Sequence, residues 1–241
     1  MDYSYQDALV FYELEGAHPG GFQLTKNLLN NEKIYEHNKI LDAGCGLGQT
    51  SQYLVETFGC QVYALDNHPE MVKQATKRFH QVNLPVNVYM SSIEEMPFPE
   101  NYFDFIIAES STSFTSIHKT IQEYYRVLKP GGILISIDMT AEAILPDVQR
   151  KEIMHFYKLK SILTEPEWIS AYDKVGFAQV KILKSNTVLE ELKNSQAADS
   201  KILPSNEDFN QILEEHYRLT FTYGNSLGYR VFRVMKYPSN P

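Results

Sequence analysis

Three glycines at alternate positions, Gly44, Gly46 and Gly48, follow an aliphatic run that contains one acid, Asp42. Glycine lets the backbone approach a ligand closely, and the free amide groups that open a helix attract polar or negative groups. The carboxylate of Asp42, just before the glycines, can bind an ammonium group. These residue types predict a loop that binds a nucleotide-like molecule with an amino-acid end.

A second acid, Asp66, ends the next aliphatic run, 22 residues after Gly44. At this distance from a glycine loop, a carboxylate can bind both hydroxyls of a ribose. A dinucleotide fingerprint requires glycine at its sixth position, where this chain has Gln49. The spacing therefore favours a nucleoside joined to an amino acid and argues against a nicotinamide dinucleotide.

Candidates for the reacting side of the site follow two later aliphatic runs. Glu109, Ser110 and Ser111 follow one run, and Asp138 closes another. His118 opens the next predicted helix and could act as a base. Glu109, His118 and Asp138 are candidates for the catalytic residue, although each could instead serve only structure. Aromatic and imidazole side chains that could line a cavity are Tyr5, Tyr12, His18, His155, Tyr157, Trp168, His216 and Tyr217.

Short aliphatic segments that alternate with amphipathic segments must position these residues. We predict strands over 40–43, 61–65, 86–90, 103–108 and 132–138, and helices over 48–58, 69–82 and 117–128. Such alternation is typical of an α/β fold, here a Rossmann-like, doubly wound, mostly parallel seven-stranded sheet with helices on both faces. Ligands bind such sheets at the carboxyl ends of the strands, where every candidate above is expected.

The remaining segments are expected to complete one domain over residues 1–241. Two short helices over residues 1–35 form a lid, and helices are predicted over Asp147 to Lys160 and from Thr164 to about Lys174. A strand over 177–183 and an antiparallel last strand over 229–236 complete the sheet. The intervening residues 184–228 include a polar patch at 194–200 and an amphipathic helix over 206–219. An insertion of this length is usually functional, and we interpret it as a substrate cap, with an edge cover or dimer surface as alternatives.

The composition narrows the possible partners and compartment. The chain has 22 Lys and Arg against 30 Asp and Glu, a net charge of −8, which disfavours nucleic acid. Its two cysteines, Cys45 and Cys60, exclude a disulfide framework and a four-cysteine zinc site, so we expect no metal and a reducing, cytoplasmic setting. No signal peptide or apolar run of membrane-spanning length is present, so no membrane partner is expected.

Several ordered segments resemble the class I S-adenosylmethionine-dependent methyltransferases, chiefly the small-molecule type. The resemblance is carried by ILDAGCGLG at 40–48, VYALDNHPEM at 62–71, SSIEEMPFPENYFDFIIAESS at 91–111, YYRVLKPGGILISID at 124–138 and LTEPEWISAYDKVGF at 163–177. One glycine loop alone is weak evidence. Successive segments in the family's order and spacing make the resemblance specific.

The resemblance implies S-adenosylmethionine as cofactor. The residues that it assigns to cofactor binding are Asp42, Gly44, Cys45, Gly46, Gly48, Asp66, Asn67, Ser92, Ile93 and Glu109. Ser92 stands where family members often carry an acid that accepts a hydrogen bond from adenine. A neutral hydroxyl is a weaker acceptor than a carboxylate, so the backbone around Ile93 could bind adenine instead.

The resemblance also implies in-line displacement of the methyl group by an oxygen or nitrogen of a small-molecule acceptor. Residues 108–111 are Ala-Glu-Ser-Ser, whereas enzymes that methylate nucleic-acid amino groups carry an Asn/Asp-Pro-Pro-aromatic tetrad there. Two alternatives remain: a non-catalytic module that binds S-adenosylmethionine, and a nicotinamide-dependent oxidoreductase. The sequence leaves the oligomeric state open, with a dimer possible.

Overall fold

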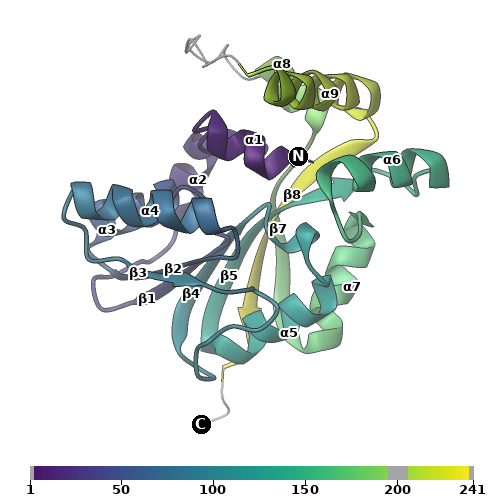
Figure 1. Ribbon diagram of the computed structural model, residues 1–241. Helices are drawn as coiled ribbons and strands as arrows, with labels where there is room; N and C mark the ends of the chain where they lie inside the picture. The colour runs from purple at the N-terminus through teal and green to yellow at the C-terminus, as the bar shows by residue number, and fades with distance from the viewer. Residues whose placement is uncertain (1–2, 195–205, 239–241) are drawn as a thin grey trace.

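The computed structural model describes residues 3–194 and 206–238 and contains one central sheet (Figure 1). The order of its strands is β3-β2-β1-β4-β5-β8-β7, and a short strand, β6, pairs with β5 outside this path. The strands are β1 Lys39–Ala43, β2 Gln61–Asp66, β3 Asn87–Met90, β4 Phe103–Glu109, β5 Leu128–Ala141, β6 Leu163–Thr164, β7 Phe177–Thr187 and β8 Leu227–Lys236.

The pairing confirms the predicted mostly parallel sheet with an antiparallel last strand. Strands β1 to β5 pair in parallel, whereas β8 runs antiparallel to both of its neighbours, β5 and β7. Seven strands form the continuous path, and β6 adds an eighth, because Leu163 and Thr164 pair with the end of β5. The sequence indicated only a helix cap at Thr164, because two residues are too few to show a strand pattern.

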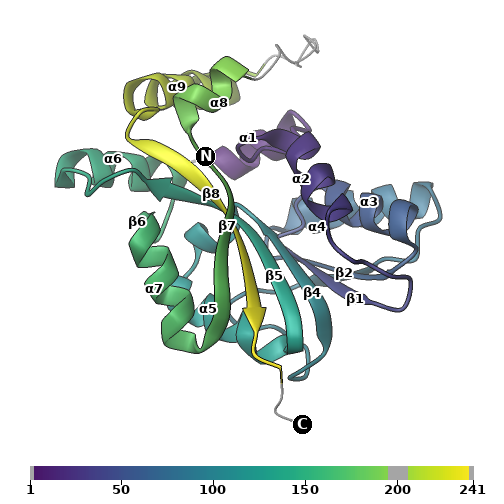
Figure 2. The same ribbon diagram turned by 180° about the vertical axis from the view of Figure 1, so that it is seen from behind.

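Helices cover both faces of the sheet, which explains why the central strands β1 and β4 are buried on both sides (Figures 1 and 2). In β1, Leu41 and Ala43 pack in the cluster that includes side chains of α5 and α7, and Ile40 packs in the cluster of α2 and α3. The helices are α1 Tyr5–Phe11, α2 Gly21–Asn30, α3 Gln49–Phe58, α4 Pro69–Gln81, α5 Ile117–Val127, α6 Asp147–Tyr157, α7 Glu165–Val175, α8 Val188–Asn194 and α9 Glu207–Tyr223, with a 3-10 turn, η1, at Thr112–Phe114.

Strands β5 and β7 are several residues longer than the sequence patterns indicate. Strand β5 has 14 residues, and β7 continues to Thr187, where it still pairs with Gly228 of β8. These extensions carry α8 and α9 beyond the end of the sheet (Figures 1 and 2). The sequence did not indicate α8, and most of the polar patch at 194–200 lies outside the described residues. No helix within the described ranges is long and apolar enough to cross a bilayer.

Helix α1 lies between α9 and the glycine loop. On one side, Tyr3, Phe11 and Tyr12 pack around Phe209 of α9, with the rings of Phe11 and Phe209 stacked 4.5 Å apart. On the other side, Val10 packs with Leu47 and Met71 beside the loop.

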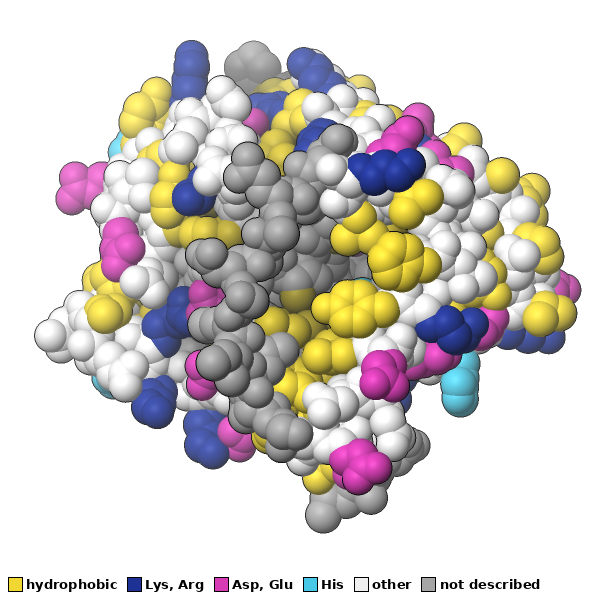
Figure 3. All heavy atoms as spheres, turned by 90° about the horizontal axis from the view of Figure 1, so that it is seen from above, with side chains coloured by type: hydrophobic (Ala, Val, Ile, Leu, Met, Phe, Trp, Pro, Cys, Tyr) yellow, Lys and Arg dark blue, Asp and Glu magenta, His cyan; other side chains and the backbone are white. Residues whose placement is uncertain are grey.

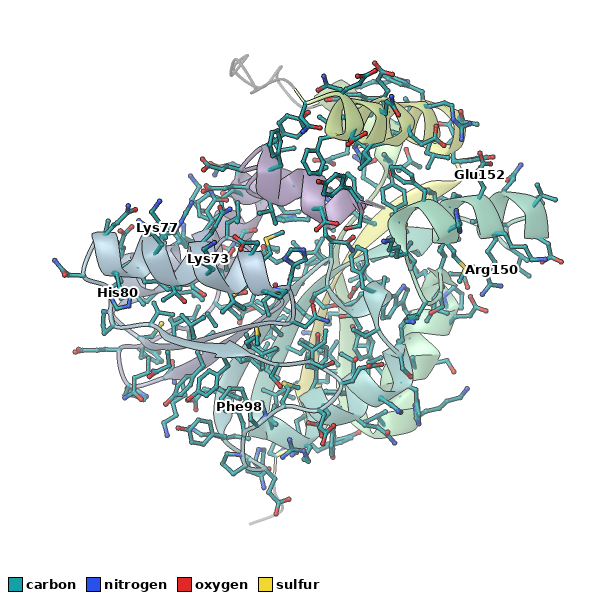
Figure 4. The ribbon with its side chains drawn as sticks, in the orientation of Figure 1. Lys73, Lys77, His80, Phe98, Arg150 and Glu152 are labelled. Carbon is teal, nitrogen blue, oxygen red and sulfur yellow. The ribbon has the colours of Figure 1, made fainter. Side chains whose placement is uncertain are left out.

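Helix α9 is also tied to α6. Arg218 donates a hydrogen bond of 2.5 Å to Glu152, and Figure 4 shows Glu152 on the side of α6 that faces α9. Tyr223 donates a second hydrogen bond to the same carboxylate. The inserted helix α9 is therefore tied to both α1 and α6.

Candidate active site

A cavity of about 420 Å³ lies at the carboxyl ends of β1, β2 and β4, beside α1. This volume falls within the range of about 300–1,000 Å³ that small-molecule and cofactor sites occupy. Its wall is formed by Ser4, Tyr5, Gln6, Leu9, Leu14, Glu15, Gly16, Ala17, His18, Gly44, Cys45, Gly46, Leu47, Gln49, Thr50, Asp66, Asn67, His68, Met71, Ser91, Ile93, Glu109, Ser110, Ser111, Phe114, Thr115 and Lys158.

The three glycines of the loop have different structural roles. A Cβ at Gly44 would lie 2.4 Å from the Cβ of Ser111, so glycine lets the loop approach the end of β4. A Cβ at Gly48 would lie 2.5 Å from Cζ of Phe79, so this glycine allows α3 and α4 to pack, and it is not part of the cavity wall. At Gly46 the nearest atom would be Sδ of Met71 at 3.9 Å. Gly46 therefore leaves backbone open to a ligand.

Asp66 is held in a fixed orientation by the loops around it. Its Oδ2 accepts a hydrogen bond of 2.9 Å from the amide of Gly46, and its Oδ1 accepts one of 2.8 Å from the amide of His68. Each carboxylate oxygen has a further lone pair, and the residue lines the cavity. This arrangement suits the binding of two ribose hydroxyls. The neighbouring Asn67 is exposed and also lines the cavity.

The loop after β3 offers an apolar side chain rather than the Ser92 hydroxyl. Ile93 lines the cavity, whereas Ser92 does not. The Oγ of Ser92 accepts a hydrogen bond of 3.1 Å from the amide of Glu94. Adenine binding through Ile93 and its backbone therefore fits this geometry better than binding through Ser92.

Asp42 lies beneath the loop rather than in the cavity wall. Its side chain is 2% exposed, and Oδ2 accepts a hydrogen bond of 2.6 Å from Ser51 of α3. Burial, together with the negative charge of Glu109, raises the pKa of Asp42 to about 7. Cys45 lines the cavity but is buried, and burial raises the pKa of its thiol well above the usual value. Cys45 therefore has the properties of a small packing residue.

Glu109, unlike Asp42, is a carboxylate that lines the cavity. It accepts hydrogen bonds from Thr50, at 2.5 Å, and from Thr25, and Nε2 of His18 lies 3.3 Å from its Oε1. Thr25 and Thr50 could not be predicted as partners of Glu109, because neither belongs to a recognisable motif. His18 appeared only among possible cavity residues.

The other catalytic candidates lie outside the cavity. His118 is exposed on α5, and Asp138 is fully buried. Ser136 donates a hydrogen bond to Oδ2 of Asp138, while Oδ1 has no partner among the described residues. Burial raises the pKa of Asp138 to about 7. Of the three candidates, only Glu109 reaches the cavity.

Ser110 and Ser111 line the cavity as predicted for the end of β4. Ser111 donates a hydrogen bond of 2.6 Å to the carbonyl of Ala43, which ties β4 to the glycine loop. Ser110 adopts a left-handed backbone with φ of 53°. Such strain in a residue other than glycine is often retained at functional sites.

Only two of the eight proposed aromatic and imidazole residues line the cavity, Tyr5 and His18. The ring of Tyr5 stacks on His216 of α9 at 4.9 Å, and the hydroxyl of Tyr157 lies 2.8 Å from Nδ1 of the same imidazole. Burial lowers the pKa of His216 to about 4. The other residues lie in the core or on the surface: Tyr12 and Trp168 are buried, and His155 and Tyr217 are exposed.

The cavity fits S-adenosylmethionine on structural grounds. The open backbone at Gly46 suits close approach, the oriented carboxylate of Asp66 suits a ribose, and Glu109 suits an ammonium group. The sheet order, the glycine loop and the acid at the end of β2 together define a class I S-adenosylmethionine-dependent methyltransferase.

Comparison with known proteins agrees, and the chain belongs to this family. The model of the methyltransferase domain family matches residues 41–136. The uncharacterized methyltransferase YodH of Bacillus subtilis is 31% identical, over 96% of this chain and 99% of its own length. Phosphoethanolamine N-methyltransferase of Plasmodium falciparum is 32% identical over 51% of this chain and 47% of that protein.

A solved structure supports the same fold. Phosphoethanolamine N-methyltransferase 2 of Haemonchus contortus, in complex with S-adenosylmethionine, superimposes with a TM-score of 0.81 at 19% identity. The match covers 98% of this chain but 58% of that one. The protein is thus an S-adenosylmethionine-dependent methyltransferase, and neither sequence-based alternative gains support from these relatives.

Proposed function

We propose that this enzyme methylates an oxygen or nitrogen of a small polar molecule enclosed beside α1. The observation that carries the proposal is the polar wall of the cavity between the end of β4 and α1. Here the side chains of Gln6 and Ser110 have no hydrogen-bond partner among the described residues. The neighbouring hydroxyls of Ser4, Ser111 and Thr115 are held by hydrogen bonds within the protein. Hydroxyl and amide groups match an acceptor that needs hydrogen bonds around its reacting atom. They favour oxygen or nitrogen over carbon as the acceptor atom, although some relatives, such as a UbiE of Rickettsia bellii at 28% identity, are C-methyltransferases by name.

We assign one part of the cavity wall to the cofactor and the rest to the acceptor. Asp66, Asn67 and Ile93 would hold the nucleoside of the cofactor, and Glu109 and the backbone of Gly44 to Gly46 its amino-acid end. When bound, S-adenosylmethionine supplies a methyl group on a positively charged sulfur. The remaining wall, from η1 and α1, is left for the acceptor.

This chain's own residues then act mainly by position. Ser111 is fixed to Ala43, and Ser110 beside it presents its hydroxyl at the end of β4. Correct positioning of reactants contributes on the order of 7–11 kcal/mol to such reactions. Tyr5, Leu9 and Phe114 contribute apolar surface that excludes water from the cavity. We infer that residues 1–35 act as a lid and that α8 and α9 support it.

No general base is assigned. Glu109 already accepts two hydroxyl hydrogen bonds and faces His18. An amine that is neutral when it reacts needs no base before attack, whereas a hydroxyl acceptor does. The cavity therefore favours an amine over an alcohol.

The test is a screen for transfer of a labelled methyl group from S-adenosylmethionine to a library of small amines, hydroxy compounds and quinones, with DNA and RNA included. We expect labelled product from small nitrogen or oxygen acceptors. Asp66→Ala serves as the matched control and should abolish labelling of the same compounds. Transfer to a carbon atom or to a nucleic acid would overturn the proposal.

A further inference from the structure

Lys158 is the one Lys or Arg among the described residues that line the cavity. The carboxylates of the wall all have partners: Asp66 accepts two amides, Glu109 faces Thr25, Thr50 and His18, and Glu15 pairs with Arg78. Lys158, in contrast, forms no ion pair or side-chain hydrogen bond within residues 3–194 and 206–238. It is a cation without a counterion beside a cavity.

The backbone at Lys158 is firmly placed. Lys158 caps the C-terminus of α6 and has a left-handed backbone, with φ of 57°. Its neighbours Tyr157 and Leu159 are buried, which fixes the turn from both sides. The amide of Lys160 donates a hydrogen bond of 3.0 Å to the carbonyl of Ser113 in η1. The turn is therefore anchored to the loop that forms the acceptor end.

The residue type is unusual for this backbone conformation. Helix C-termini with a left-handed residue usually carry glycine there, because a side chain costs about 1 kcal/mol. A lysine at this position keeps that strain, as residues at functional sites often do. Its side chain is exposed and shares the cavity wall with Phe114 and Thr115.

Helix α1 completes this end of the cavity. The ring of Tyr157, next to Lys158, meets the ring of Tyr5 edge to face at 5.2 Å. Ser4, Tyr5 and Gln6 line the same cavity. Lys158 thus lies where α6, η1 and α1 meet, in the part of the cavity wall that is left for the acceptor.

We propose that Lys158 binds an anionic group of the acceptor, a carboxylate or a phosphate. This proposal rests on the proposed function and adds the substrate class: a small amine or alcohol that also carries a negative charge. A cationic side chain with no counterion attracts such a group, and a charge-assisted hydrogen bond fixes its direction. The anion then orients the other end of the acceptor toward β4, where the methyl group is transferred.

The experiment measures anion binding directly. The full-length protein, saturated with S-adenosylhomocysteine, is titrated with inorganic phosphate and separately with acetate, while the backbone amide resonances of residues 113–116 and 157–160 are followed. Sodium chloride at equal ionic strength is the reference. We expect saturable shifts with phosphate, acetate or both, and the anion that binds identifies the group.

The variants are Lys158→Gln, Lys158→Gly and, as matched control, Lys160→Gln, which removes an exposed lysine outside the cavity wall. The first two should weaken anion binding at least tenfold, and the control should leave it unchanged. Lys158→Gly suits the left-handed turn and should fold, which the amide spectrum checks. Equal binding in Lys158→Gln and wild type, or shifts reproduced by chloride, would overturn the proposal.

Methyl transfer plays no part in this readout. Anion binding through Lys158 without any small-molecule methylation would contradict the proposed function and leave the anion site standing. Methylation of small acceptors with no anion binding at Lys158 would contradict the anion site and leave the proposed function standing.

Discussion

Nε2 of His18 lies 3.3 Å from Oε1 of Glu109, so the segment between α1 and α2 closes directly onto the end of β4. Thr25 of α2 and Thr50 of α3 donate hydrogen bonds to the same carboxylate. One acidic side chain therefore joins the N-terminal segment, the helix after the glycine loop and the strand that leads to the acceptor. We propose that the same carboxylate binds the ammonium group of the cofactor.

Replacing Glu109 by glutamine should weaken binding of S-adenosylhomocysteine at least tenfold. Glutamine keeps the size of the side chain but removes the negative charge that a charge-assisted hydrogen bond requires. Isothermal calorimetry measures the affinity. Glu94→Gln is the matched control, because Glu94 also accepts a hydrogen bond, from the amide of Ser116 at 2.6 Å, but lies outside the cavity wall. Equal losses of affinity in the two variants would show that Glu109 does not bind the cofactor.

Gly46→Ala should reduce cofactor affinity more than it reduces stability. Gly46 and Gly131 both have positive φ, 52° and 78°, and a Cβ at either would meet no atom closer than 3.9 Å. Both alanine variants should therefore lower the free energy of unfolding by about 1–2 kcal/mol through backbone strain. Only Gly46→Ala should weaken binding of S-adenosylhomocysteine, because only Gly46 lines the cavity. A loss of affinity in Gly131→Ala, or none in Gly46→Ala, would contradict this interpretation.

The central fold could be predicted because its information is local. Strands such as 40–43 and 103–108 are apolar on both faces, and each ends at a turn or helix cap that the sequence displays. The extension of β7 to Thr187 depends instead on pairing with Gly228, 41 residues further along the chain, which no local pattern records. For the same reason, α8 and the limits of the insertion could not be placed.

In the candidate site, too, residues placed by local patterns could be predicted, and residues placed by tertiary packing could not. Asp66 and the glycines were found because a strand, a loop and a helix put them at one sheet edge. The partners of Glu109 were missed because Thr25 and Thr50 are 84 and 59 residues away, and only tertiary packing brings them together. Asp42 was expected to face the ligand, but on β1 it shares a face with Ile40, and its side chain turns under α3 toward Ser51.

Asp138→Asn should change how stability depends on pH. Burial raises the pKa of Asp138 from 3.8 to about 7, so the folded protein holds a proton that the unfolded chain has already released. Its contribution to the free energy of unfolding therefore decreases as pH rises from about 4 to 7 and is constant above that window.

Asparagine carries no such charge, so the variant should gain stability relative to wild type across this window, by at most about 4 kcal/mol. Chemical denaturation at several pH values measures the difference. Asp147→Asn, at an exposed position on α6, should show a constant difference from wild type. A constant difference for Asp138→Asn as well would mean that Asp138 is charged in the folded protein.

Phe209→Ala should loosen α1 from α9 and thereby weaken the closure of the cavity. Phe209 is 6% exposed, whereas Phe221 on the same helix is 69% exposed. Figure 3 shows that hydrophobic side chains reach the surface on the face seen from above. Truncating a buried phenylalanine typically costs about 3–5 kcal/mol. Hydrogen exchange in α1 should become faster in Phe209→Ala and stay unchanged in Phe221→Ala. Under our proposal that residues 1–35 form a lid supported by α9, KM for the acceptor should rise only in Phe209→Ala. Unchanged exchange and KM in that variant would contradict this proposal.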